Sequence, residues 1–150
     1  MQKLNLPQYE FKFKMLGQIT QIFDIVRKKY TALTPEEWVR QHIIHFLIHE
    51  KGFPASLIGV EKGIVFNGLK KRVDILIFDR NAKPFMIVEC KAPQVKISQE
   101  VFDQASIYNL QLNVKFLLVT NGFKHFCFYL DPEKEGFQFV DEIPNCPEDF

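Results

Sequence analysis

The sequence predicts an α/β domain in which helices flank a mixed β-sheet. Two segments, residues 34–52 and 98–113, have the capping residues and apolar content of helices that pack on a sheet. Short runs rich in Ile, Val and Phe lie between and after them, as expected for strands. A strand–helix–strand unit at residues 85–119 implies a parallel pair with a right-handed crossover. The expected order is helix, three antiparallel strands, helix, two strands.

Length and composition indicate one packed domain. A chain of 150 residues with 47% hydrophobic residues, 16 of them Phe, is long enough for one core and too short for two comfortable domains. We therefore predict a single domain at residues 1–150. Residues 1–30 are expected to form an N-terminal hairpin extension, and residues 141–150 a loose acidic tail.

Charge and cysteine content limit the function classes. The net charge is +1, so no global field directs the chain to nucleic acid or to a membrane. The three cysteines have no metal-ligand spacing and suit reduced thiols. No signal peptide and no membrane-spanning apolar run is visible, so the sequence predicts a soluble cytoplasmic domain with no membrane partner.

The first half of the chain carries clear start and stop signals. A hairpin is expected across Gly17 and Gln18. Thr34 is placed to cap the first helix, Pro35 lies in its first turn, and Gly52 ends it. The next three strands are expected at residues 56–66, 71–78 and 84–90.

The second half repeats this pattern. Ser98 is the expected N-cap of the second helix. Residues 115–120 and 123–130 are expected to form a hairpin, because Asn121 and Gly122 favour a type I′ turn.

Two carboxylates interrupt the most strand-like part of the chain. If Asn81 and Ala82 are the central residues of the turn between the second and third strands, Asp74 lies directly opposite Glu89. Lys91 is two residues past Glu89 and therefore points to the same face. A bulge next to Pro84 would shift this register by one residue.

Opposed carboxylates need compensation by a proton, a basic side chain or a divalent cation. Oxygen ligands without His or Cys favour Mg²⁺ or Mn²⁺. Such a cation would bind a phosphate and activate water, and Lys91 would orient the water or stabilise developing charge. The alternative is an ordinary ion pair of Lys91 with one of the acids.

The segments "VDILIFD", "IVECKAP" and "QASIY" resemble the PD-(D/E)xK nuclease superfamily. More narrowly, "IFDIVRKKYTALTPEEWVRQHIIHFLIHEKGFP" and "VTNG" resemble the N-terminal domain of type I restriction enzyme R subunits. The resemblance spans roughly residues 22–130. It implies a restriction-endonuclease-like fold and cleavage of phosphodiesters with a divalent metal ion. Val73 replaces the proline of the nominal motif, a change that is common in the superfamily.

The resemblance also implies roles for individual residues. Asp74 and Glu89 match the metal-binding acids, and Lys91 matches the catalytic lysine. Glu37 matches the helix acid that often completes the metal site. The nucleic-acid-contacting or supporting residues are Gln104 and Tyr108, which match a Q-x-x-x-Y helix motif.

Other polar residues have more ordinary interpretations. Glu37 lies in a first helical turn, where acids are common, and its neighbour Glu36 could occupy the same role. Gln104 and Tyr108 could equally be a semi-buried polar pair. Glu61 is more typical of a surface acid. The stripe of His42, His45 and His49 has one i, i+4 pair but no third ligand in view, so a packing face is favoured over zinc.

The function that these residues predict is Mg²⁺- or Mn²⁺-dependent hydrolysis of DNA, in restriction, defence or DNA processing. The alternatives are a non-cleaving module that binds nucleic acid or a partner protein, and an RNA-directed nuclease. No P-loop motif occurs, so a helicase or translocase, or another restriction subunit, is expected to act in trans.

Overall fold

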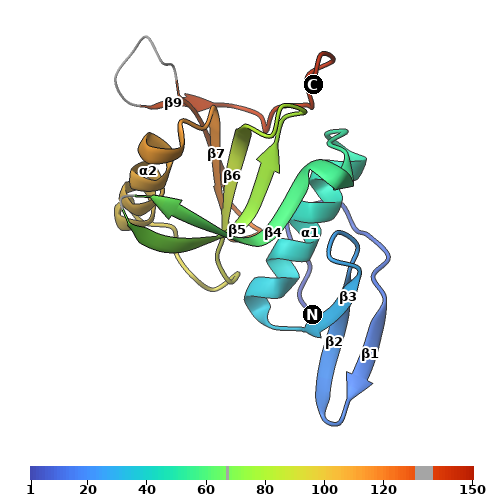
Figure 1. Cartoon of the computed structure of the whole chain (residues 1–150). Coiled ribbons are helices and arrows are strands. Elements are labelled where there is room, and N and C mark those ends of the chain that lie inside the picture. The colour runs from blue at the N-terminus through green and yellow to red at the C-terminus, as the bar shows by residue number, and fades with distance from the viewer. Residues whose placement is uncertain (67, 131–136) are drawn as a thin grey trace.

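The computed structural model describes residues 1–66, 68–130 and 137–150 and contains two sheets and two α-helices (Figure 1). The larger sheet has six strands in the order β4-β5-β6-β7-β8-β9, and the smaller has three in the order β1-β2-β3. The strands are β1 Phe13–Leu16, β2 Ile19–Asp24, β3 Lys29–Ala32, β4 Ile58–Phe66, β5 Leu69–Phe78, β6 Pro84–Cys90, β7 Phe116–Thr120, β8 His125–Leu130 and β9 Phe137–Val140. The helices are α1 Pro35–His49 and α2 Gln99–Leu112, and a 3₁₀ turn, η1, covers Ala55–Leu57.

The six-stranded sheet is mixed, as the sequence predicts. β6 and β7 are parallel and joined through α2, whereas the other neighbouring strands are antiparallel. The helix, three strands, helix, two strands order is confirmed, and β9 is an additional strand that sequence reasoning missed. The N-terminal hairpin turns at Gly17 and Gln18, and β3 extends it into a small sheet that was not anticipated.

The helix α1 begins and ends at the expected signals. The Thr34 side chain accepts a hydrogen bond of 3.0 Å from the Glu37 backbone N–H, and Pro35 is the first helical residue. Gly52 follows the helix with φ +79, a conformation that glycine adopts without steric cost. These caps fix the position at which Glu36 and Glu37 enter the first turn.

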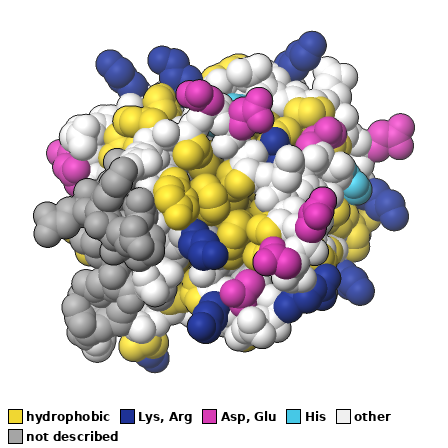
Figure 2. Space-filling view, turned by 90° about the horizontal axis from the view of Figure 1, so that it is seen from above, with side chains coloured by type: hydrophobic (Ala, Val, Ile, Leu, Met, Phe, Trp, Pro, Cys, Tyr) yellow, Lys and Arg dark blue, Asp and Glu magenta, His cyan; other side chains and the backbone are white. Residues whose placement is uncertain are grey.

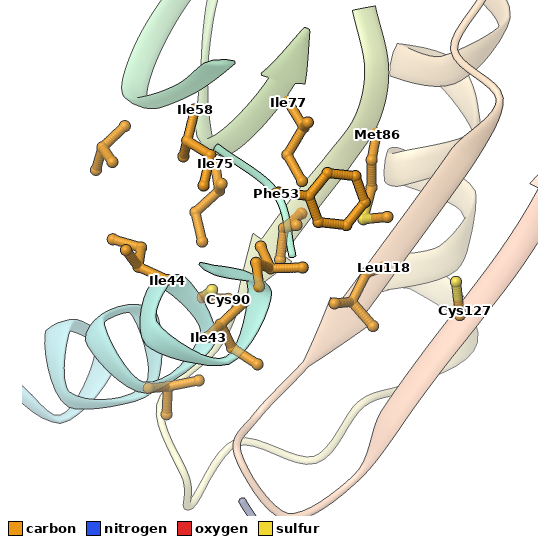
Figure 3. Close-up of a cluster of buried hydrophobic side chains, with 14 of the residues drawn as sticks. Ile43, Ile44, Phe53, Ile58, Ile75, Ile77, Met86, Cys90, Leu118 and Cys127 are labelled. Atoms are coloured by element: carbon orange, nitrogen blue, oxygen red, sulfur yellow. The ribbon is translucent and has the colours of Figure 1, made fainter. Parts of the chain in front are cut away.

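The two helices cover opposite faces of the large sheet, and each face has its own core. On the α1 side, Ile43 and Ile44 point toward Ile75 and Cys90 (Figure 3). On the other side, Val101 and Phe102 of α2 pack against a separate cluster, whose buried members are Val73, Leu76, Ile87, Val114, Leu117, Val119 and Phe128. Burial on both faces explains the almost uninterrupted apolar runs of β6 and β7.

The turn between β5 and β6 differs from the prediction, but the register beyond it does not. Asp79, not Arg80, pairs with Lys83 through a backbone hydrogen bond of 2.8 Å, and the Asp79 carboxylate accepts from two backbone N–H groups of the turn. An irregularity between Ile77 and Phe78 then restores the expected pairing, so that Ile75 lies opposite Val88. The bulge anticipated near Pro84 therefore exists. It shifts the pairing by one residue, which compensates for the wrongly predicted turn.

Two further expectations were wrong. Thr120 pairs with His125, so the β7–β8 loop has four residues and is not a two-residue type I′ turn. Asn121 Oδ1 holds this loop by accepting from two backbone N–H groups. The tail is not loose: Phe150 packs edge-on against Phe53 and Phe85.

The surface mixes charges of both signs. Figure 2 shows hydrophobic side chains gathered in the middle of one face, with Lys or Arg and Asp or Glu side chains around them. This pattern agrees with the net charge of +1. Among the described residues, no helix is both long and apolar enough to span a membrane.

Candidate functional site

Asp74 and Glu89 converge on neighbouring strands of the large sheet. The pairing of Ile75 with Val88 places Asp74 and Glu89 at the next position of the same register. Asp74 Oδ2 accepts a hydrogen bond of 2.7 Å from the Cys90 backbone N–H, which ties it to the end of β6. Burial, the charge of Asp74 and a hydrogen bond shared with Asp74 raise the pKa of Glu89 to about 8. The folded protein therefore disfavours the charged form of Glu89.

A backbone irregularity accompanies this convergence. Ile75 belongs to the core on the α1 side, but Val73 belongs to the core on the α2 side, although alternate residues of a regular strand share a face. Asp74 lies between them. On β4, the residue between the two flanking pairs is Glu61, which has a φ of +52. The local kink accounts for the access of Asp74 to side chains of α1.

The site fits a divalent cation by the chemistry of its donors. Glu89 Oε1 is buried and has no hydrogen-bond partner among the described residues. A buried carboxylate oxygen without a partner costs free energy, which a bound cation would remove. Asp74 and Glu89 offer only oxygen ligands, which suit Mg²⁺ or Mn²⁺.

Glu36 and Lys91 lie close enough to this pair to interact with it electrostatically. Burial, together with the charge of Asp74, raises the pKa of Glu36, and the positive charge of Lys91 opposes that rise. Lys91 also opposes the rise in the pKa of Glu89. The Lys91 backbone N–H donates to Thr120 O at 2.8 Å, so the residue is held where β6 leaves the sheet. Three carboxyl groups and one ammonium group therefore act on one another electrostatically: those of Asp74, Glu89, Glu36 and Lys91.

Glu37 lies in a different environment from Glu36. Its Oε1 accepts from Arg27 at 3.3 Å and its Oε2 from Gln41 at 3.1 Å, while Arg40 Nε lies 3.3 Å from Oε2. The side chain is 6% exposed. Both oxygens thus serve basic and amide groups, and the structure does not bring Glu37 together with Glu89.

Arg40 connects that environment to the candidate site. Its Nη2 lies 3.7 Å from Asp74 Oδ1, and its Nη1 lies 3.1 Å from Glu61 Oε1. The guanidinium is 6% exposed, so its charge acts with little screening by water. Glu61 is therefore paired with arginine, and part of the charge of Asp74 is already compensated.

The other predicted residues are Gln104 and Tyr108, which lie on α2, and the three histidines, which lie on α1. Gln104 is exposed on α2, and the side chain of Tyr108 lies outside the described residues. The three histidines pack with Tyr9, as the ring distances of 5.2 Å to His45 and 6.0 Å to His49 show. In the part of the chain that the structure describes, no three His, Cys, Asp or Glu side chains are already arranged around a metal position.

Sequence reasoning missed the buried polar network that supports the site. Asp24 is fully buried and accepts hydrogen bonds from Arg27 Nε at 2.8 Å and from Gln41 at 3.0 Å. Gln41 and Arg40 follow Glu37 at i+4 and i+3, a spacing that places polar side chains together on a helix. This spacing in the sequence could have indicated that the three side chains interact. The hydrogen bond of Gln41 with Asp24, in contrast, depends on the tertiary fold.

Comparison with known proteins places this geometry in a family. The family described as type I restriction enzyme R protein N terminus (HSDR_N) matches residues 35–144, which run from the first turn of α1 past β9. The chain belongs to this family. The narrower of the two resemblances seen in the sequence is therefore confirmed.

Two solved structures share the fold of this R protein N-terminal domain. A fragment assigned to an HsdR subunit of a type I restriction enzyme from Vibrio vulnificus YJ016 has 24% identity and a TM-score of 0.52, over 75% of this chain and 24% of that chain. The type IIG restriction endonuclease BpuSI has 21% identity and a TM-score of 0.52, over 71% of this chain and 13% of its own. No curated protein matches the sequence. This chain thus covers only 24% and 13% of the two chains that it matches, and β1–β3 precede the region that the family model matches.

Proposed function

We propose that this R protein N-terminal domain hydrolyses DNA phosphodiester bonds with Mg²⁺ or Mn²⁺ held by Asp74 and Glu89. The observation that carries the proposal is the convergence of these two carboxylates, which raises the pKa of Glu89 to about 8. Two carboxylates that cannot both ionise in the free protein form a poised site for a doubly charged cation. Membership of a restriction enzyme family supports DNA as the substrate.

The side chains around the pair have separate tasks. A bound divalent cation would polarise a phosphate oxygen and make a water molecule more nucleophilic. Lys91 orients the attacking water or stabilises the negative charge that develops on the phosphate. Glu36, whose pKa already responds to Asp74 and Lys91, is our candidate for the third carboxylate in place of Glu37.

Surrounding groups hold these side chains in place. The Cys90 backbone N–H fixes one oxygen of Asp74, and Arg40 lies beside the other. Gln104, exposed on α2, is a candidate contact for the nucleic-acid backbone, and Tyr108 one turn later is proposed to support it. The domain is proposed to act together with a translocase or another restriction subunit, the setting that its family implies.

A second candidate function is a domain that binds nucleic acid or a protein without cleavage. Arg40 favours this reading, because a buried guanidinium 3.7 Å from Asp74 Oδ1 already supplies part of the positive charge that a cation would bring. In that case the carboxylates would be retained for structure, and the domain would have no requirement for Mg²⁺.

Metal binding and cleavage in parallel test the proposal. Mn²⁺ binding is followed by electron paramagnetic resonance, and cleavage is followed on plasmid and linear DNA. We expect Asp74→Asn to lose Mn²⁺ binding while keeping the fold, because asparagine can still accept from the Cys90 N–H. Lys91→Met should retain Mn²⁺ but cleave at least about 100-fold more slowly, the scale of losing one transition-state contact.

Matched controls come from the same fold. Lys83→Met lies at the far end of the β5–β6 hairpin, and Glu142→Gln removes an exposed acid; both should behave as wild type. Wild-type Mn²⁺ affinity in Asp74→Asn would overturn the proposal. DNA binding that persists in EDTA and in Lys91→Met, with no cleavage by any variant, would favour the non-cleaving domain.

A further inference from the structure

The three-stranded sheet has one packed face and one open face. Residues on the packed face include Ile22, which is fully buried, and Phe13, which is 48% exposed and whose ring lies 6.4 Å from that of Trp38 on α1. The register places the alternate residues together on the other side. We call this side the platform face; its members are Lys12, Lys14, Leu16, Ile19, Gln21, Phe23, Tyr30 and Ala32.

Two aromatic rings lie side by side on the platform face. Phe23 and Tyr30 are directly paired across β2 and β3, and their ring centroids are 5.1 Å apart. Both side chains are half-buried, so each ring keeps part of its surface open to solvent. Leu16 and Ile19 extend this apolar surface toward the β1–β2 turn and are 62% and 54% exposed. A small sheet that was needed only for packing would have no reason to present so much apolar surface.

Lysines border these rings. Lys14 Nζ lies 4.4 Å from the centroid of Tyr30, and Lys12 Nζ lies 5.8 Å from that of Phe23. Both lysines are exposed, and none of the eight platform residues is acidic. The platform face therefore combines flat aromatic surface with positive charge, whereas the face seen in Figure 2 carries charges of both signs.

The chemistry of this face matches an unpaired nucleic-acid strand. Bases that are not in a duplex expose their π faces and stack on aromatic side chains, while lysines neutralise the adjoining phosphates. A duplex hides those π faces, so it would use the lysines but not the rings. A protein partner would gain little from two lysines positioned over aromatic rings.

We infer that the platform face binds single-stranded DNA, by stacking bases on Phe23 and Tyr30 and holding phosphates with Lys12 and Lys14. The inference rests on the proposed function only for the choice of DNA over RNA. The platform lies outside the segment that defines the family, and its β1–β2 turn projects away from the large sheet (Figure 1). The β2–β3 turn, at the other end, contacts Glu61 and Glu37 through Arg27. A strand on this face would thus be bound by an element fixed to the surroundings of the candidate active site.

Binding of labelled oligo(dT) in EDTA, measured by fluorescence anisotropy, tests the inference without cleavage. Tyr30→Leu keeps an apolar side chain but removes the ring, and should weaken binding about 5- to 100-fold, the effect expected for losing one stacked base. The control Phe13→Leu lies on the packed face of the same sheet and should leave binding unchanged. Equal affinities of Tyr30→Leu and wild type would overturn the inference.

The salt dependence tests the lysines separately. Replacing Lys12 and Lys14 by Gln should reduce the slope of log affinity against log salt concentration by about 1.4, the value for two contacts to single-stranded phosphates. The control pair Lys28→Gln and Lys29→Gln removes the same charge from the sheet outside the platform face, and should change the slope less. An equal change in both pairs would show general charge attraction and overturn the assignment.

Other ligands give distinct results. Preference for oligo(U) or for duplex DNA over oligo(dT) would overturn the assignment to single-stranded DNA. Loss of self-association in Tyr30→Leu, without loss of DNA binding, would identify a second copy of the chain as the occupant. Asp74→Asn should bind oligo(dT) like wild type in EDTA. A result against metal-dependent cleavage can therefore be distinguished from a result against DNA binding by the platform face.

Discussion

At the scale of single residues, Glu36 and Glu37 show how one helical turn separates two tasks. The side chain of Glu36 is 47% exposed and lies 3.8 Å from Arg40 Nη2, within the field of Asp74 and Lys91. The side chain of Glu37 is 6% exposed and contacts Arg27, Arg40 and Gln41. Adjacent positions on a helix differ by about 100° in direction, which is enough to place one acid at the site and the other in its support.

Replacement of these two acids should therefore have opposite effects on stability and metal binding. Glu37→Gln removes one carboxylate partner from the buried Arg40 and from the half-buried Arg27, and should lower the free energy of unfolding by about 2–4 kcal/mol. Glu36→Gln removes a half-exposed acid and should cost less than about 1 kcal/mol, but should weaken Mn²⁺ binding. Urea unfolding and Mn²⁺ titration of both variants make the comparison. Weaker Mn²⁺ binding in a folded Glu37→Gln, with Glu36→Gln unaffected, would restore Glu37 as the ligand.

The sequence was informative about the site for a simple geometric reason. Asp74, Glu89 and Lys91 lie on two strands joined by a short connection, so local register predicts their proximity. The predicted turn was wrong, but the irregularity between Ile77 and Phe78 restored the register. Arg40 and Asp24 could not be placed in the same way, because their partners come from elements far apart in sequence.

At the scale of elements, strong local signals predicted most of the fold. Thr34 and Pro35 defined the start of α1 because an N-cap and an N1 proline act within one turn. β3 and β9 were missed because each has only four residues and depends on a neighbouring strand for its pairing. The β7–β8 loop was misjudged because Asn121 uses its side chain as a turn acceptor and does not adopt a positive φ.

The aromatic surface of α1 should make the protein sensitive to mild acid. Burial, followed by the charges of His49 and His42, lowers the pKa of His45 to about 4. The unfolded chain binds a proton on this histidine near pH 6.5, whereas the folded chain does not, so stability is complete above pH 6.5 and falls as the pH decreases toward 4.

The size of this effect follows from the exposure of His45. The residue is 7% exposed, so the folded protein disfavours its charged form, and we expect a loss of about 1–2 kcal/mol between pH 7 and pH 4.5. Urea unfolding at several pH values measures it. His45→Gln should remove much of the pH dependence, whereas His49→Gln should reduce it less, because the charge of His49 contributes only part of the shift in the pKa of His45. Identical slopes in His45→Gln and wild type would contradict this assignment.

At the scale of the whole molecule, the two sheets are joined by one half-buried guanidinium. Arg27, in the β2–β3 turn, binds Asp24 of β2 at 2.8 Å, Glu61 of β4 at 2.9 Å and Glu37 of α1 at 3.3 Å. Burial tends to raise the pKa of Asp24, but hydrogen bonds from the Arg27 backbone, Gln41 and the Arg27 side chain outweigh it, and the pKa is lowered. The polar network therefore couples the small sheet to the helix that carries Glu36.

Removal of this guanidinium should release the small sheet before the large one. Arg27→Met leaves Asp24 buried with fewer partners, and we expect a loss of about 2–4 kcal/mol, the scale for breaking a buried ion pair. Hydrogen exchange in β1–β3 should become faster than in β5–β7, whose cores on both sides of the sheet do not involve Arg27. Exchange measured by mass spectrometry, with the adjacent exposed Lys28→Met as control, resolves the two sheets. Uniform acceleration throughout the chain would show that the two sheets unfold as one unit, and that Arg27 stabilises the molecule without acting as a separable link.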